Sequence, residues 1–567
     1  MKFRIFWLIL SLGSWVAIAA QADDLGSGLS ESEMDSAAAD AAPDTADEPA
    51  PDADDSQALR LSLDESIRLA LQNNLDVEVQ RFTPLVAGEQ ETEAWGAYDP
   101  EFFAEFGYSD TDNPSSFLLE GLGVGEIGVS KSDSYDGFGG FRGLLPYFGS
   151  EYSFQFNGER TTTNLPVQSF SPEYRSSFSL SVSQPLLRGL IWNEAWTRVK
   201  TSRIRYDESL ENFRRRVMDT VQEVEDSYWN LIATSEQKRV AQKSLETAQA
   251  LLDQTETQYE VGVVSKVEVV EAQAGVADRE FNLIAADNRY RTAQDRLINL
   301  VLSTELTPDS KLRIEPTDPP KEYVTYHVDA KQATQRAFEQ RPELKIADDA
   351  IERQKLELKF AKNERLPRLD IQFNYGNRGL AGKQNPRLPN PDFVAPPDPP
   401  FLPAGTISEG NFGDTVDDFL TDSAADQISA RALLTIPLTN TAARSRVSQT
   451  ELELRRTTVQ KRRLEQDIIL EVRKAVRDLE SSQEGIEAAQ RASEASAEQL
   501  RAERIRLEYG ESTPFDVLLR EEDFVTAESR EIEAIRLYRI SVTGLSRAQG
   551  SILANRNIAI DQISAVR

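Results

Sequence analysis

The chain has 567 residues, 40% of them hydrophobic, a formal net charge of −31 and no cysteine. Without cysteine it cannot form disulfides, use thiol chemistry or carry a lipid on an N-terminal cysteine after cleavage. The acidic balance disfavours a nucleic-acid partner, because neutralising phosphates requires basic patches.

Residues 1–22 have the pattern of a secretory signal peptide. Lys2 and Arg4 precede an apolar run over 5–20, and Ala-Gln-Ala at 20–22 fits a small-residue cleavage site. No later stretch approaches about 18 consecutive apolar residues, so the sequence predicts no membrane-spanning helix. Export without such a helix leaves a periplasmic protein, a secreted protein or a β-barrel.

The next segment, 23–58, is expected to be a disordered acidic tail. Twelve acidic residues and no Lys or Arg lie between Asp23 and Asp55, interleaved with Ala, Ser and Pro. Such a composition cannot bury enough apolar surface to fold. A solvated spacer is the simplest interpretation, and a tail that attracts cations or binds a partner is the alternative.

The rest of the chain repeats one order of features, which predicts repeats at 61–310 and 326–550 and a C-terminal tail at 551–567. Residues of the first copy recur in the second at matching positions: Ala70 and Ala337, Pro100 and Pro367, Phe106 and Phe373, Tyr108 and Tyr375, Pro185 and Pro437, Gly262 and Gly510. Each copy reads as a helix, two strands, a long helix, a tight turn and a shorter helix.

Each copy is expected to open with a capped helix. Ser62 with Glu65, and Asp329 with Gln332, can bond the free N–H groups of a first helical turn. These helices are expected to end before the paired prolines, because the residue before a proline is pushed out of the helical region.

Apolar and polar residues then alternate, which predicts two strands per copy. The alternation covers 102–109 and 177–183 in the first copy, and 368–375 and 432–436 in the second. A barrel wall between lipid and water fits this alternation, and a soluble sheet fits it equally well. The stretches 110–174 and 376–426 are rich in Gly, Pro, Asn and Ser and are expected to be loops.

The long helices carry stronger information. Residues 193–260 contain no proline or glycine, and a helix of this length would measure about 100 Å at 1.5 Å per residue. Apolar residues recur every seventh position, which predicts coiled-coil seams. The first seam, interrupted by Lys238, has Val217, Val224, Leu231, Leu245, Leu252 and Tyr259; the second has Val472, Leu479, Ile486, Ser493, Leu500 and Leu507.

Each long helix is expected to turn back at a glycine. Gly262 and Gly510 are placed for a left-handed helix end. Ser265 with Glu268, and Thr513 with Asp516, can then form the capping boxes of the returning helices.

This duplicated order resembles the TolC-like outer membrane efflux proteins. The resemblance rests on Leu61-Ser62-Leu63-Asp64-Glu65-Ser66, on Ser183-Gln184-Pro185-Leu186-Leu187 and on the two turn motifs around Gly262 and Gly510, and it runs from about Leu61 to Gly550. It implies an α+β membrane protein: a homotrimer with four strands per subunit in a twelve-stranded outer-membrane β-barrel, continued by a periplasmic helical barrel.

The resemblance also implies partners and site residues. The partners are outer-membrane lipid, an inner-membrane transporter and a periplasmic adaptor protein that meets the hairpin tips at Gly262, Ser265, Gly510 and Thr513. Asp516, and Glu268 in the first copy, are periplasmic gate candidates, where three copies would form an acidic ring. Both acids can also be helix caps and nothing more, and both glycines can be purely structural.

The function expected is that of a passive exit channel in a tripartite efflux or type I secretion system, not an enzyme. The sequence offers no catalytic constellation, no phosphate-binding loop and no cofactor or metal motif. A periplasmic coiled-coil scaffold without channel activity is the alternative. The exported cargo is not encoded in any motif of the chain.

Overall fold

A computed structural model describes residues 58–115, 128–165, 167–390, 401–405, 407–421 and 426–559. The chain divides into two units, 1–55 and 56–567, and the description concerns the second. The expected signal peptide at 1–22 and all but the last residue of the acidic segment 23–58 lie outside the described residues. Within these ranges no helix combines the length and apolarity that crossing a membrane requires.

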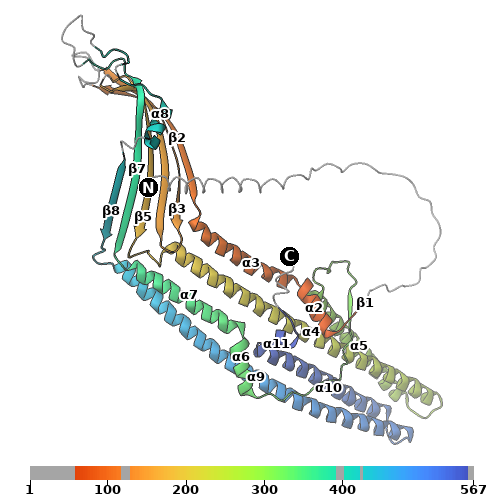
Figure 1. Cartoon of the computed structure of the whole chain (residues 1–567). Helices are drawn as coiled ribbons and strands as arrows, with labels where there is room; N and C mark the ends of the chain where they lie inside the picture. The colour runs from red at the N-terminus through yellow and green to blue at the C-terminus, as the bar shows by residue number, and fades with distance from the viewer. Residues whose placement is uncertain are drawn as a thin grey trace, which may run out of the picture. The chain divides into compact units, whose positions relative to one another are not determined.

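The helices follow one order twice, as Figure 1 shows. In the first copy they are α2 (Leu63–Asn73), α3 (Leu75–Trp95), the short 3-10 turn η1 (Gly96–Tyr98), α4 (Glu194–Glu260) and α5 (Lys266–Val301). In the second copy they are α6 (Ala330–Gln340), α7 (Pro342–Glu364), α9 (Thr441–Glu508) and α10 (Pro514–Ala548), followed by the short α11 (Ile552–Asn555).

The first helix of each copy begins at the residue expected. The Ser62 side chain accepts a hydrogen bond from the Glu65 amide, and the Glu65 carboxylate accepts one from the Ser62 amide, so the capping box is present. Asp329 caps α6 by accepting from the Lys331 amide. Both helices break once before continuing into α3 and α7, at Asn74 and Arg341.

The long helices have 67 residues in α4 and 68 in α9. The second seam is confirmed over most of its length, with Val472, Leu479, Ile486, Ser493 and Leu500 buried. In α4 the seam holds at Val217, Val224 and Leu231, which are fully buried.

The first seam departs from the expected positions after Lys238. Leu245 and Leu252 are only partly buried and Tyr259 is exposed, whereas Ala248 and Leu251 are buried. Lys238 itself forms an ion pair with Asp287 of α5, 2.7 Å away. The seam shifts because α4 packs against α3, α5, α7 and α10, so its buried face changes along its length.

Each copy has a hydrophobic core of its own. The first joins α2, α4 and α5 with the parallel strand pair β1 (Ala58–Leu61) and β6 (Arg313–Pro316). The second joins α6, α9 and α10. Ile552 and Leu553 of α11 are buried in the first core, so the stretch expected to be a C-terminal tail begins by closing the core of the other copy.

One antiparallel sheet has six strands in the described residues, in the order β2-β3-β4-β5-β7-β8. They are β2 (Glu101–Ser115), β3 (Gly128–Leu145), β4 (Ser150–Thr163), β5 (Phe170–Pro185), β7 (Arg368–Gln384) and β8 (Gln427–Thr435). The four expected strands are present as β2, β5, β7 and β8.

The expectation of four strands per subunit is wrong, because β3 and β4 lie in the stretch 110–174 expected to be loop. In β3 the alternation is hidden by glycines, which carry no side chain to mark a face. Strand β4 does alternate, with Tyr152, Phe154 and Phe156 between polar residues, and the expectation of a loop disregarded this signal. A Cβ on Gly140 would lie only 2.1 Å from the Phe154 carbonyl oxygen, so the close approach of β3 to β4 requires glycine there. Similarly, 376–426 contains the helix α8 (Phe412–Thr421).

The sheet has two chemically different faces. The register places one set of residues together, here called the aromatic face: Phe102, Phe106, Tyr108, Tyr135, Phe141, Tyr152, Phe154, Phe156, Phe178, Leu180, Val182, Phe373, Tyr375, Ile428 and Leu434. The opposite, polar face carries mostly charged and hydroxyl or amide side chains, among them Glu105, Asp136, Gln155, Ser177, Ser179, Ser181, Gln372 and Arg431.

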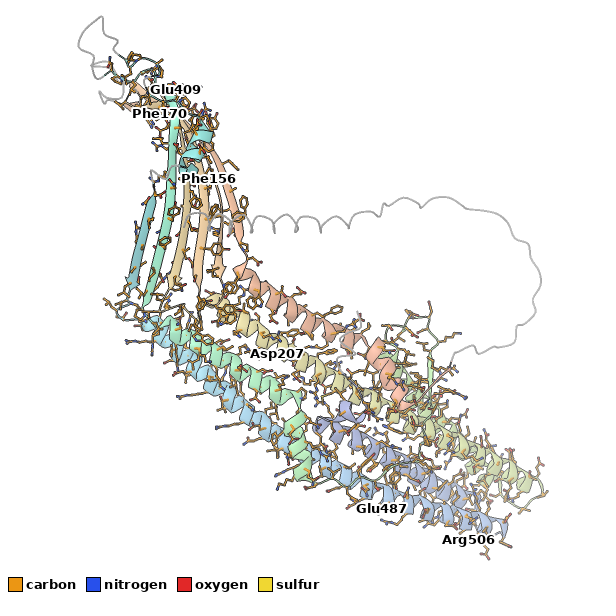
Figure 2. The ribbon with its side chains drawn as sticks, in the orientation of Figure 1. Phe156, Phe170, Asp207, Glu409, Glu487 and Arg506 are labelled. Atoms are coloured by element: carbon orange, nitrogen blue, oxygen red, sulfur yellow. The ribbon has the colours of Figure 1, made fainter. Side chains whose placement is uncertain are left out.

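Ring contacts run across neighbouring strands on the aromatic face. Phe154 and Phe178 lie 4.8 Å apart between ring centroids, and Phe178 and Tyr375 lie 6.2 Å apart. Phe106, at 88% exposure, and Ile428, at 68%, leave the face open to its surroundings at both edges of the sheet. Phe156, labelled in Figure 2, belongs to the same face.

Helix α8 covers the aromatic face at the end remote from the long helices. The Ser176 hydroxyl donates to the Thr415 carbonyl at 3.0 Å, and a Cβ on Gly379 would lie 1.9 Å from that same oxygen. Small residues on β5 and β7 therefore make room for α8, and the open aromatic surface ends at this level.

Candidate functional site

The turn between α4 and α5 forms the first hairpin tip. Gly262 has φ +79° and donates to the Tyr259 carbonyl, while the Val263 amide donates to the Gln258 carbonyl at 2.8 Å. These two bonds close the end of α4 as a Schellman motif. The expected left-handed helix end at Gly262 is confirmed.

The turn between α9 and α10 forms the second tip in the same way. Gly510 has φ +74° and donates to the Leu507 carbonyl, and the Glu511 amide donates to the Arg506 carbonyl at 2.8 Å. Arg506, labelled in Figure 2, lies in the last turn of α9. Figure 1 places both tips at the end of the helices away from the sheet.

Both returning helices begin with the expected capping boxes. The Ser265 amide and hydroxyl donate to the Glu268 carboxylate at 3.3 and 3.1 Å. The Thr513 amide and hydroxyl donate to the Asp516 carboxylate at 3.3 and 2.7 Å. The hydrogen bonds from the Thr513 hydroxyl and amide hold the pKa of Asp516 below its usual range, so it is ionised at neutral pH.

The structure does not bring the two acids together. Across the described residues, no hydrogen bond or ion pair joins Glu268 to Asp516, since each carboxylate is engaged with its own cap. Both are partly exposed.

Exposed apolar side chains surround the capped turns. Val261, Val263 and Val267 at the first tip are 72%, 71% and 64% exposed, and Tyr509 at the second is 79% exposed. Side chains of this kind in water are unfavourable unless another molecule covers them. They form the candidate contact surface of the tips.

A small core joins the two hairpins behind their tips. It contains Ala248 and Leu251 of α4, Leu500 of α9, and Val517 and Leu518 of α10. Helix α5 approaches α10 at Gly275, where a Cβ would lie 2.8 Å from the Leu518 Cδ1. The nearby Arg279 guanidinium donates to the Leu518 carbonyl at 3.1 Å. The hairpins are therefore packed against each other and not independent.

Buried acids lie where α10 faces α4. Glu521 is only 2% exposed, and burial raises its pKa, although Arg504 and Arg279 oppose the shift. Burial also raises the pKa of Glu528. On α4, burial raises the pKa of Asp226 to about 6. Burial thus disfavours the charged form of all three carboxyls, and Asp226 changes its charge near pH 6.

The spacing of residues along α10 contains a signal for these acids. Glu521 and Glu528 lie four and eleven residues after the buried Val517, so the three residues fall on one stripe of the helix. Charged residues on an otherwise apolar stripe predict buried, interacting groups.

A network of ion pairs holds the middle of the helical region. The Arg547 guanidinium contacts Asp219 at 2.7 Å and Glu343 at 3.0 Å, and Arg341 contacts Glu343 and Glu471 at 3.0 and 2.6 Å. Although burial opposes ionisation, hydrogen bonds and charge from Arg341, with the charge of Arg547, lower the pKa of Glu343 to about 2.

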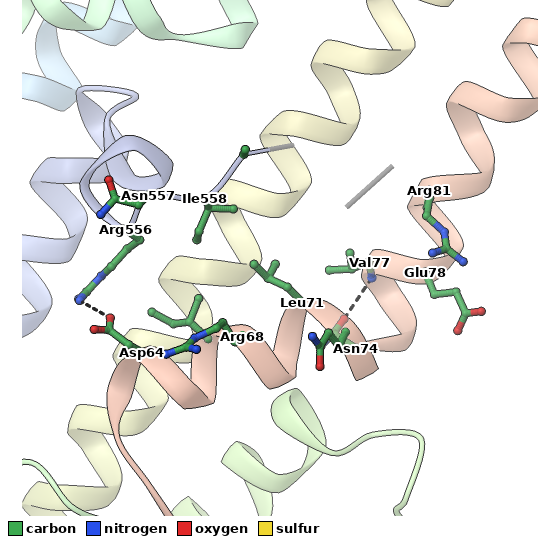
Figure 3. Close-up of a pocket in the computed structure, with 13 residues that line it drawn as sticks. Asp64, Arg68, Leu71, Asn74, Val77, Glu78, Arg81, Arg556, Asn557 and Ile558 are labelled. Atoms are coloured by element: carbon green, nitrogen blue, oxygen red, sulfur yellow. Dashed lines mark hydrogen bonds and ion pairs between the residues drawn. The ribbon is translucent and has the colours of Figure 1, made fainter. Parts of the chain in front are cut away.

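A second branch of the network links the two ends of the described chain. Arg556, just after α11, contacts Asp64 at 3.0 Å and Glu225 at 2.8 Å. Figure 3 shows the Arg556–Asp64 pair at one side of a groove of about 740 Å³, with Leu71 and Val77 farther along. In the part of the chain that the structure describes, no cluster of acidic or His residues could hold a metal ion.

Comparisons with known proteins agree with this architecture. The family model described as "Outer membrane efflux protein" matches residues 142–301 and 333–551. No curated protein matches the chain.

Solved structures share the fold at low sequence identity. The Campylobacter jejuni CmeC outer membrane channel is 14% identical, with a TM-score of 0.60 and 89% of each chain covered. The open state of the Neisseria gonorrhoeae MtrE outer membrane channel is 16% identical, with a TM-score of 0.57, covering 87% of this chain and 89% of that one. The Vibrio cholerae outer membrane protein VceC is 13% identical, with a TM-score of 0.58, covering 86% and 96%.

Proposed function

This chain belongs to the outer membrane efflux protein family, and we propose that three copies of it form one conduit leading from an inner-membrane transporter to the cell exterior. It is an outer-membrane exit channel with a periplasmic helical domain and not an enzyme. Channels of this family are trimers that work with adaptor proteins and inner-membrane pumps.

The observation that carries the proposal is the two-faced sheet continued by long helical hairpins. Aromatic and aliphatic side chains on one face suit lipid, and hydroxyl, amide and charged side chains on the other suit water. Helices of 67 and 68 residues, about 100 Å long, suit a tube that crosses an aqueous compartment.

We further propose that a periplasmic adaptor covers the hairpin tips. The turns at Gly262 and Gly510, with Ser265 and Thr513, are narrow because both glycines are left-handed. The exposed valines of the first tip would be removed from water by such a partner.

Asp516 is the proposed gate residue of the periplasmic end, with Glu268 as a second candidate. Three ionised carboxylates around one axis would attract cations and bind multivalent ones. What supports Asp516 is its ionised state and partial exposure. The Thr513 amide and hydroxyl both donate to Oδ2 of Asp516, so the cap does not use Oδ1.

The direct test is the conductance of the purified full chain in planar bilayers, with its mass and membrane fraction measured alongside. A channel should sediment with outer membranes, run as a trimer and conduct ions. A coiled-coil scaffold would be periplasmic and give no conductance, and that result would reject the proposed function.

A further inference from the structure

The hairpin β3–β4 is inserted between two strands that are expected to be neighbours. In the second copy β7 pairs directly with β8, but in the first copy β2 and β5 are separated by β3 and β4. The two copies therefore contribute unequally to the sheet.

This hairpin is part of the wall and not an outer loop. Strand β2 pairs with β3 along its full length, from Glu101–Arg142 to Ser115–Gly128, and β4 pairs with β5 over Glu151–Thr161. The strands have 18 and 14 residues, more than the roughly 9–11 that a tilted strand needs to cross a bilayer.

The turn of the hairpin lies at the helical end of the sheet. Tyr147, between β3 and β4, has its ring centroid 4.8 Å from that of Trp196 in the first turns of α4. A Cβ on Gly149 would lie 2.5 Å from the Gly189 carbonyl, just before that helix. The hairpin thus spans the full height of the sheet.

The edge strands β2 and β8 have no neighbour on their outer side within the described residues. Phe106 on β2 and Ile428 on β8 show that the same exposed aromatic face reaches both edges. Hydrocarbon cannot satisfy the N–H and C=O groups of an open edge, so both edges must pair with strands. Six antiparallel strands leave β2 and β8 running in opposite directions, so β8 of one copy can pair with β2 of the next.

We propose that three copies join edge to edge, β8 to β2, and close a barrel of eighteen strands, six from each copy. The inference rests on the proposed trimeric channel and replaces its expected twelve-stranded wall. Because barrel diameter grows roughly linearly with strand number, this wall is about 1.5 times as wide as one of twelve strands.

The wider wall changes what lines the exit. The polar face of β3 and β4 adds Asp136, Arg142, Gln155, Asn157 and Glu159 to the lumen. The cargo class this lumen suits is a hydrated, polar solute, since barrels of 16–18 strands enclose an aqueous channel.

Disulfide crosslinking of the full-length chain tests the strand order, because the native sequence has no cysteine. The first variant is Ala104→Cys with Gly139→Cys, across β2 and β3. A Cβ on Gly139 would lie 3.8 Å from the Ala104 Cβ, which is the usual Cβ separation of a disulfide. The control is Ala104→Cys with Phe178→Cys, across β2 and β5, which meet only if the hairpin leaves the wall.

The edge contact is tested by pairing a cysteine at Ala104 or Phe106 with one at Ala430 or Ala432 on β8. We expect a crosslinked ladder that ends at three chains for at least one of these combinations. The β2–β3 pair should close within one chain, and the β2–β5 pair should stay reduced.

Different outcomes separate the inference from the function. Efficient β2–β5 crosslinking in a conducting trimer overturns the eighteen-stranded wall and leaves the channel intact. A crosslinked β2–β8 ladder that ends at two chains also overturns the barrel of eighteen strands. If the cysteine-free parent neither conducts ions nor forms an oligomer, the proposed function is rejected. The crosslink between β2 and β3 still reports the strand order in that case.

Discussion

One substitution can separate the capping role of Asp516 from its proposed role in the gate. In Asp516→Asn the side-chain carbonyl oxygen still accepts a hydrogen bond from the Thr513 hydroxyl. The cap is therefore largely kept while the charge is lost. We expect lower cation preference and weaker block by multivalent cations, measured from reversal potentials and blocker titrations in bilayers.

The matched control is Glu268→Gln, which makes the equivalent change in the first copy's cap. If both variants keep the parent's selectivity and block, the two acids only cap their helices. An effect of Glu268→Gln alone would move the gate to the first copy.

Arg547 is expected to be among the most sensitive residues outside the tips. It is about nine-tenths buried and bridges Asp219 and Glu343, so its removal leaves Asp219 without this cation and Glu343 paired with Arg341 alone. We expect Arg547→Met to lower the free energy of unfolding by about 3 kcal/mol. Thermal unfolding in detergent measures this, with Arg501→Met, from an exposed pair with Glu498, as a near-neutral control.

Asp226 should make stability depend on pH in an unusual direction. Burial raises its pKa to about 6, so the folded state binds a proton more tightly than the unfolded state does. Its contribution is therefore present at low pH and is lost as the pH rises through about 6. We expect Asp226→Asn to gain about 1 kcal/mol at pH 7.5 and nothing below pH 4, discounting for its partial exposure.

The measurement for Asp226 is the difference in unfolding temperature between variant and parent across pH. The difference isolates this group from Glu343, whose lowered pKa acts in the opposite direction: it stabilises above its ordinary pKa and loses that effect as the pH falls toward about 2. A difference that does not change with pH would show that folding does not raise the pKa of Asp226.

At the scale of elements, the two long helices should respond differently to the same change. Ile486 of α9 is fully buried on the regular second seam, whereas Leu245 of α4 is only partly buried after the Lys238 interruption. We expect Ile486→Ala to cost about 3 kcal/mol and Leu245→Ala about 1 kcal/mol. Equal losses in chemical unfolding would mean that the first seam continues unbroken in the assembly.

At the scale of the whole molecule, adjacent glycines of β3 should have opposite importance for assembly. A Cβ added to Gly140 would lie 2.1 Å from the Phe154 carbonyl oxygen. The atom nearest to a Cβ added to Gly139 would be the Phe103 carbonyl oxygen, 3.6 Å away. We expect Gly140→Ala to displace β4 from β3 and reduce trimer yield several-fold, and Gly139→Ala to leave it unchanged. Native mass measurement of the detergent-solubilised channel reports the yield. Normal assembly of Gly140→Ala would place the hairpin outside the wall.

The duplicated order of helices and strands could be predicted from the sequence alone. The capping boxes at Ser62, Ser265 and Thr513, the left-handed glycines at the tips and the second heptad seam are local or periodic signals. Local signals of this kind depend on a few neighbouring residues, so they survive without knowledge of the rest of the fold.

Only the tertiary structure decided the width of the sheet and the positions of the buried charges. The strand β3 is rich in glycine, so it has no side-chain alternation, and its position between β2 and β4 depends on backbone pairing over long sequence distances. The Arg547 network joins residues from both copies, including Asp219 and Glu343, which no local pattern connects. Periodicity records which face a residue occupies, but the partner on that face is set by packing between distant segments.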